Sequence, residues 1–126
     1  MAVSVYTLKN ITEAREFEAV QRRSLERYIE AGNYAALNDI VLDLATAQGA
    51  VKVFELLEIL EKSNATTLER IEELTGFLSD GADDAGSGRG NDARRAYFDG
   101  IRQASSRQLV KLYRQAEKEF YDEVTY

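Results

Sequence analysis

The 126-residue sequence contains no cysteine, histidine, proline or tryptophan. Without thiols and imidazoles it has no disulfide, no Cys or His metal ligand and no Ser–His or Cys–His nucleophile. Every Asp and Glu falls in a charged helical face or a polar loop, and none stands in an apolar run that would raise its pKa. The sequence is still compatible with a catalytic pair of carboxylates of the glycosidase type. We therefore expect a protein that is not an enzyme and that carries no cofactor and no metal.

The chain also lacks a long uninterrupted apolar segment. Its most apolar stretch, residues 37–60, is too polar to span a membrane, because it is interrupted by Asp39, Asp43, Lys52, Glu55 and Glu58. The first residues lack the basic region and apolar run of a signal peptide. We expect a cytoplasmic protein, or one assembled into a particle in the cytoplasm, that is neither secreted nor transmembrane.

Acidic side chains outnumber basic ones, 22 to 16. The net charge is −6, and it belongs to the first ninety residues, which hold 9 basic and 16 acidic side chains. Residues 91–126 hold 7 basic and 6 acidic ones. An acidic protein is repelled on average from nucleic acids and anionic membranes, so any such contact needs a local basic patch.

Apolar residues recur at steps of three and four along most of the chain, which predicts an all-α fold: a small helical bundle of about four to five helices. Asn10 with Glu13, and Thr66 with Glu69, resemble capping boxes that open helices. Gly32 ends the first helix. Polar residues of the second helical region change face near Gly49, so we expect a break there, between segments 34–47 and 50–62.

The sequence indicates a single helical domain, residues 1–126, in four parts. Residues 1–9 form an extended arm with alternating Val3 and Val5, and residues 10–79 form the helical core. Residues 80–91, rich in Gly and Asp, form a long flexible loop. Residues 92–123 form a long C-terminal helix whose weak point is Gly100. The loop matches neither a phosphate-binding glycine motif nor a calcium-binding loop, so we interpret it as a connection.

The sharpest surface feature is basic. On the last helix four cations lie within roughly 60° of one another on a helical wheel, opposite an apolar face. The cations are Arg107, Lys111, Arg114 and Lys118, and the apolar face is Leu109, Leu112, Ala116 and Phe120. Such a face contacts phosphates or an acidic partner, or is an ordinary solvated face balanced by nearby acids.

Seven tyrosines are many for this length. Tyr28, Tyr97 and Tyr113 lie on or beside apolar faces, so we expect them at the edge of the core. Tyr121 and Tyr126 end the chain, where an aromatic tail either anchors in a neighbouring subunit or frays.

Together these features predict a non-enzymatic structural or assembly protein that acts through protein–protein contacts. We expect a homo-oligomeric subunit of a larger complex, such as a connector-like subunit between the head and tail of a viral or phage particle, by analogy of size and shape alone. The candidate interaction residues are Val3, Val5, Arg107, Lys111, Arg114, Lys118, Tyr121 and Tyr126.

The alternative prediction is a module that binds nucleic acid or a nucleoprotein through the basic face of the last helix. A variant of it is an acidic antagonist that competes for a basic site. The acids available for that role are Glu69, Glu72, Glu73, Asp80, Asp83 and Asp84.

Overall fold

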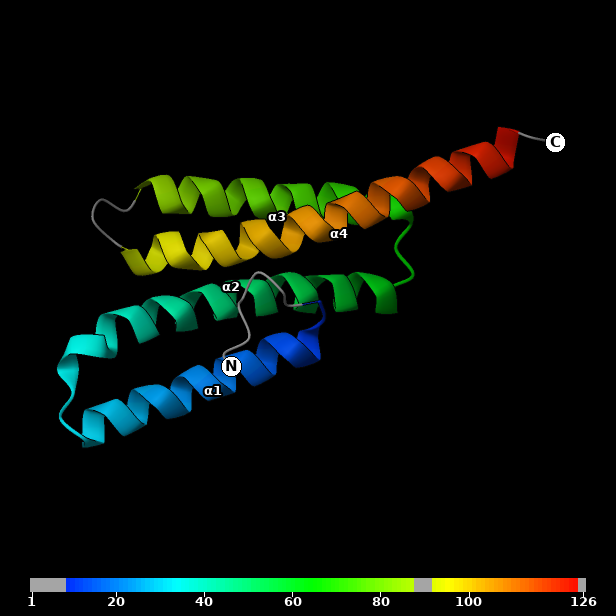
Figure 1. Ribbon diagram of the computed structural model, residues 1–126. Coiled ribbons are helices and arrows are strands. Elements are labelled where there is room, and N and C mark those ends of the chain that lie inside the picture. Colours follow the sequence, from blue (N-terminus) through cyan, green and yellow to red (C-terminus); the bar gives the residue numbers. More distant parts are fainter. Residues whose placement is uncertain (1–8, 88–91, 125–126) are drawn as a thin grey trace.

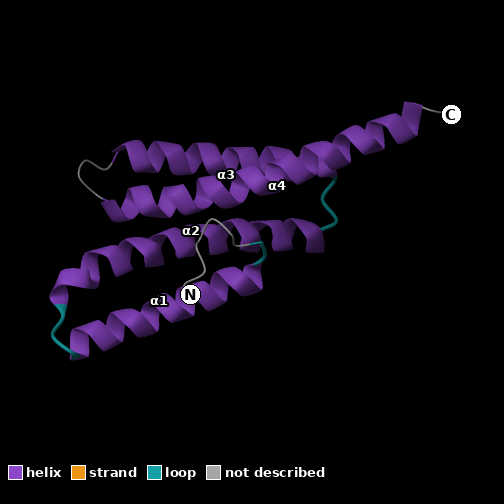
Figure 2. Ribbon diagram, viewed as in Figure 1, coloured by secondary structure: helices purple, strands orange, loops and turns teal. Residues whose placement is uncertain are grey.

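The structure is a computed structural model that describes residues 9–87 and 92–124, with side chains for 9–82 and 92–120. Its helices are α1 (Ile11–Glu30), α2 (Leu37–Lys62), α3 (Thr67–Ser87) and α4 (Asp92–Val124), and a short 3-10 helix, η2 (Tyr34–Ala36), precedes α2. Figure 2 shows helices and loops only in this part of the chain. The prediction of an all-α bundle is confirmed, and α4 agrees with the long helix expected over residues 92–123.

The helices lie side by side in the order α1, α2, α4, α3 (Figure 1). The most extensive contact joins α2 to α4, which are far apart in sequence and run in the same direction. α1 then packs on the outer side of α2, and α3 packs on α4. The C-terminal end of α4 projects beyond the other helices (Figure 1).

The two predicted N-caps are confirmed. Asn10 Oδ1 accepts a hydrogen bond from the Glu13 amide at 2.9 Å, and Thr66 Oγ1 accepts one from the Glu69 amide at 3.1 Å. Each bond satisfies one of the amides that a helix start leaves without an intrahelical partner.

In a chain without proline, residues in the left-handed region end α1 and α2. Gly32 has φ 70° and follows α1, where the amide of Asn33 bonds back to the Tyr28 carbonyl at 2.9 Å. Asn64, with φ 57°, has the same place after α2. Gly and Asn are the residues that adopt this conformation most readily, so the sequence fixes both corners locally.

α2 and α4 cross with their backbones in contact at Gly49 and Gly100. A methyl group on Gly49 would overlap the carbonyl oxygen of Tyr97, and one on Gly100 would overlap the carbonyl oxygen of Thr46. The expected break at Gly49 is therefore wrong, because this glycine permits close packing within a continuous helix. Gly100 is likewise a contact point of α4 rather than a weak one.

The change of polar face along α2 has a different cause from a break. The first half of the helix buries Thr46, whose hydroxyl donates to the Leu42 carbonyl at 2.9 Å. The second half exposes a stripe on which Lys52 pairs with Glu55. Since α1 and α4 pack on α2 from different sides, each half buries a different face. Large residues then fill the core around the crossing: Val53, Phe54, Ile71, Leu74, Ile101 and Leu112.

The flexible loop expected over residues 80–91 is wrong for its first part. α3 continues to Ser87, so residues 80–87 are helical. Gly81 lies against Phe98 of α4, since a methyl group added at Gly81 would come within 3.2 Å of the Phe98 ring. Residues 88–91, and residues 1–8 of the expected arm, lie outside the described residues.

Replacing either crossing glycine with alanine should destabilise the protein. The added methyl group meets backbone atoms that cannot rotate away, so we expect Gly49→Ala or Gly100→Ala to lower the free energy of unfolding by more than about 2 kcal/mol. Gly76→Ala is the matched control, since its methyl group would meet nothing within 4 Å. It should stabilise α3 by about 0.5–1 kcal/mol. Urea unfolding followed by circular dichroism measures all three, and equal effects would contradict the close crossing.

A buried hydroxyl gives a second stability prediction. Ser105 is fully buried, and its Oγ has no hydrogen-bond partner among the described residues. Removing an unsatisfied buried hydroxyl is neutral or favourable, so Ser105→Ala should raise the free energy of unfolding by up to about 1 kcal/mol. Ser106→Ala is the control, because it removes an exposed hydroxyl bonded to the Arg102 carbonyl and makes the same change in helix propensity. A loss of stability in Ser105→Ala larger than in the control would contradict the assignment.

Candidate interaction surface

The outer half of α4 carries the four predicted cations, Arg107, Lys111, Arg114 and Lys118, and all four are exposed. We call this set the basic ridge. Near Gly100 and Ala104 the same stripe of the helix is covered by α2, but further along α4 it is open. Within the described part of the chain, Lys111, Arg114 and Lys118 form no ion pair. These three side chains therefore present positive charge that no ion pair with a described residue neutralises.

The structure adds Lys9 to this surface. Lys9 precedes α1, and its backbone amide donates to Glu13 Oε2 at 2.9 Å. It lines, together with part of the basic ridge, a shallow cavity of about 380 Å³ whose lining is Lys9, Arg107, Gln108, Val110, Lys111 and Arg114. Sequence reasoning missed Lys9 because only the packing of α1 on α2 brings it to α4. Lys118 lies beyond this cavity.

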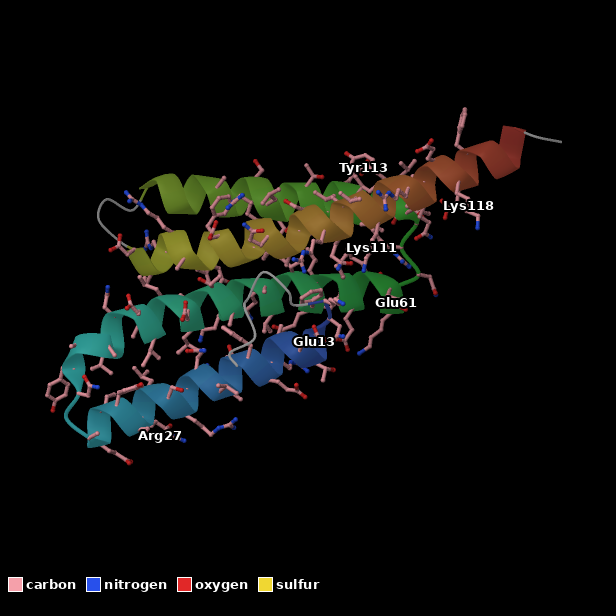
Figure 3. All side chains as sticks on the ribbon, in the orientation of Figure 1. Glu13, Arg27, Glu61, Lys111, Tyr113 and Lys118 are labelled. Carbon is pink, nitrogen blue, oxygen red and sulfur yellow. The ribbon has the colours of Figure 1, made fainter. Side chains whose placement is uncertain are left out.

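Another flank of the same half of α4 exposes large apolar side chains. Tyr113 is 59% exposed and Phe120 61%, although both were expected on or beside the apolar face that enters the core. Tyr113 and Lys111 project from opposite flanks of the helix (Figure 3). Leu112 of the predicted apolar face is buried. Phe120 follows Glu119, whose Oε1 accepts a hydrogen bond from Thr67 Oγ1 at the start of α3 (2.9 Å).

The other predicted contact residues are placed only in part. Tyr121 belongs to the last turns of α4, but its side chain lies outside the described residues. Val3, Val5 and Tyr126 lie outside them altogether. Tyr97 is half-buried, as expected for the core edge. Its burial is the main reason that the pKa of its hydroxyl is raised; the charge of Lys52 lowers this pKa and that of Glu55 raises it.

The acids of α3 line a groove. Glu72, Glu73 and Asp80 border a hollow of about 290 Å³ between α3 and α2, whose remaining lining is Leu56, Gly76 and Phe77. Because α3 continues through residues 80–87, Asp80 stands on a helix in register with the other acids. The side chains of Asp83 and Asp84 lie outside the described residues.

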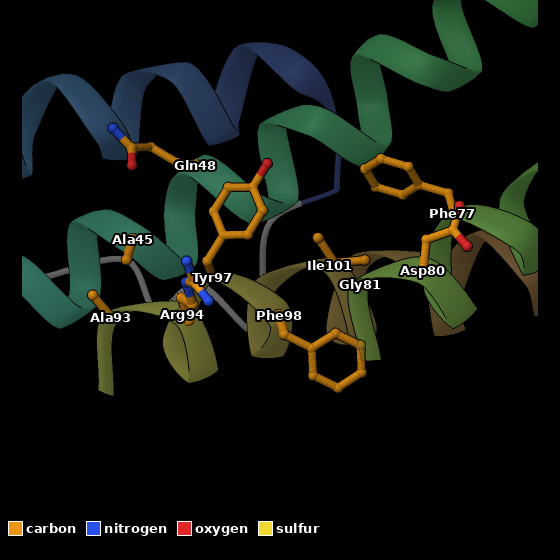
Figure 4. Close-up of a pocket in the computed structure, with 10 residues that line it drawn as sticks. All are labelled: Ala45, Gln48, Phe77, Asp80, Gly81, Ala93, Arg94, Tyr97, Phe98 and Ile101. Carbon is orange, nitrogen blue, oxygen red and sulfur yellow. The ribbon is translucent and has the colours of Figure 1, made fainter. Parts of the chain in front are cut away.

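A larger cavity, of about 670 Å³, lies where α2, α3 and α4 meet (Figure 4). Its lining is mostly apolar and aromatic and includes one carboxylate, Asp80, and one guanidinium, Arg94. The described residues contain no group of three or more acids that could hold a metal ion. Elsewhere, burial and then the neighbouring charge of Asp39 raise the pKa of Asp43 on α2.

Comparison with known proteins finds no match to any family model, to any curated protein or to any solved structure. Among the described helices, none has the length and apolar composition needed to cross a bilayer.

Proposed function

We propose that this chain is a non-enzymatic structural or assembly protein that acts through protein–protein contacts, as a homo-oligomeric subunit of a larger complex. The observation that carries the proposal is the set of large apolar side chains exposed on the outer half of α4. Val110, Tyr113 and Phe120 are 50%, 59% and 61% exposed. Tyr113 and Phe120 are seven residues apart, so they share a face of the helix. Grouped exposed apolar side chains are typical of interaction surfaces.

The chemistry of the surrounding surface supports the same function. The basic ridge runs along the same half of α4, so one projecting helix offers apolar and charged contacts together (Figure 3). Protein interfaces combine an apolar, often tyrosine-rich centre with a polar rim in this way. α4 is also held in place by its crossing with α2 and its packing on α3, which presents the surface on a rigid element.

Size-exclusion chromatography with light scattering tests this proposal. The wild-type chain should have a mass above the 14.2 kDa of one copy. The double variant Tyr113→Ser/Phe120→Ser should shift toward that mass, because it removes two large exposed apolar side chains of α4. Tyr34→Ser is the control, since Tyr34 is 68% exposed but lies on η2, at the other end of the molecule. A wild-type mass of one copy at every concentration would contradict the proposal.

The second candidate is a module that binds nucleic acid, and the position of Lys9 favours it. Lys9 and three residues of the basic ridge line one cavity. Four cations grouped in this way are suited to contact the phosphate backbone of a nucleic acid. Gel-shift titration should then show binding that weakens steeply with salt and is lost in Arg107→Glu/Arg114→Glu. Arg23→Glu/Arg27→Glu makes the same charge change on α1 and should retain binding. Absence of binding at low salt would remove this candidate.

A further inference from the structure

Two ridges of opposite charge lie on separate surfaces of the molecule. The basic ridge borders the cavity that α4 shares with Lys9, whereas the acids of α3 border the groove between α3 and α2. These two hollows share no lining residue. In the part of the chain that the structure describes, neither Glu73 nor Asp80 takes part in an ion pair. Charges that form no ion pair among the described residues remain available to another copy.

The two ridges match in spacing. We call Glu69, Glu73 and Asp80 the acidic ridge; all three are exposed on α3. With Gly76 between them, their positions follow steps of four, three and four residues, and the basic ridge follows the same steps. Each ridge therefore extends over about 16 Å of helix. Two helices with this register can bring opposite charges together at three of the four positions, with Gly76 at the fourth.

Each ridge also has an apolar neighbour. Val110, half exposed, lines the same cavity as the basic ridge. Leu56 and Phe77 line the groove beside the acidic ridge. Gly76 leaves the α3 backbone open at the middle of this ridge, since even a methyl group there would meet nothing within 4 Å. The groove can thus accept another helix closely, with apolar contact beneath the ion pairs.

We propose that copies of this chain join head to tail: the basic ridge on α4 of one copy docks along the acidic ridge and the α2–α3 groove of the next. This inference rests on the proposed function and adds a charged contact between these two surfaces to the apolar contact through Tyr113 and Phe120. Because the surfaces differ, each copy keeps one of each kind free after pairing. Such a heterologous contact builds a closed ring or an open filament rather than a symmetric dimer.

Charge reversal and mixing test the contact. One variant, Lys111→Glu/Arg114→Glu, cancels the net positive charge of the basic ridge, and the other, Glu73→Lys/Asp80→Lys, makes the acidic ridge net positive. Each variant alone should lose association at least about tenfold, because one of its two surfaces no longer attracts the other. Mixed in equal amounts, they should associate again, since the intact acidic ridge of the first variant then meets the intact basic ridge of the second. Raising the salt from about 50 mM to about 500 mM should weaken wild-type association by about tenfold or more.

Matched controls place the same charge changes on α1. Arg23→Glu/Arg27→Glu and Glu26→Lys/Glu30→Lys involve exposed residues and should associate as the wild type does. Light scattering gives the masses, and circular dichroism confirms that each variant is folded.

The outcomes separate this inference from the proposed function. If the wild type associates but mixing does not restore association, the head-to-tail contact is wrong while the assembly function stands. The head-to-tail contact is also wrong, and the assembly function stands, if only the Lys111→Glu/Arg114→Glu variant loses association, because the basic ridge then binds a surface other than α3. Loss of nucleic-acid binding in that variant alone would identify nucleic acid as the ligand of the basic ridge. If the wild type has the mass of one copy throughout, both proposals are overturned.

Discussion

At the centre of the molecule α2 and α4 approach so closely that neither has room for a methyl group at Gly49 or Gly100. Close-packed interiors leave little freedom around such a contact, so the large core residues must lie to either side of it. The two helices are remote in sequence, and their crossing joins them into the central pair on which the other helices pack. α1 and α3 then each cover one side of that framework, α1 on α2 and α3 on α4.

The same crossing decides which part of α4 stays open. Lys118 is eighteen residues, or five full turns, beyond Gly100 and so has the same angular position on the helix. Where that stripe faces α2 it contains the buried Gly100 and Ala104, and where it is exposed it contains the basic ridge. The character of the stripe changes from small and apolar to charged because its surroundings change along one helix.

The helices, their caps and the basic ridge follow from local sequence, because capping bonds and wheel positions involve residues three or four apart. The mistaken break at Gly49 has a physical origin: glycine permits both a turn and a close helix contact, and only the position of Tyr97 on another helix distinguishes them. The helix through Ser87 likewise gains from Phe98 packing on Gly81. The exposure of Tyr113 and Phe120, and the approach of Lys9 to α4, depend on where the neighbouring helices end, which no local pattern records.

The grouping of like charges runs against what an isolated helix needs. Arg107 with Lys111, Arg114 with Lys118 and Glu69 with Glu73 each place equal charges four residues apart, which destabilises a helix. The second half of α2 does the opposite and pairs Lys52 with Glu55 and Glu58 with Lys62. Solubility alone would be served as well by the alternating pattern of α2. Segregated charge of both signs, bordering hollows that share no lining residue, is instead favourable where opposite charge arrives from another molecule. That argues for contact between copies as the use of α3 and α4.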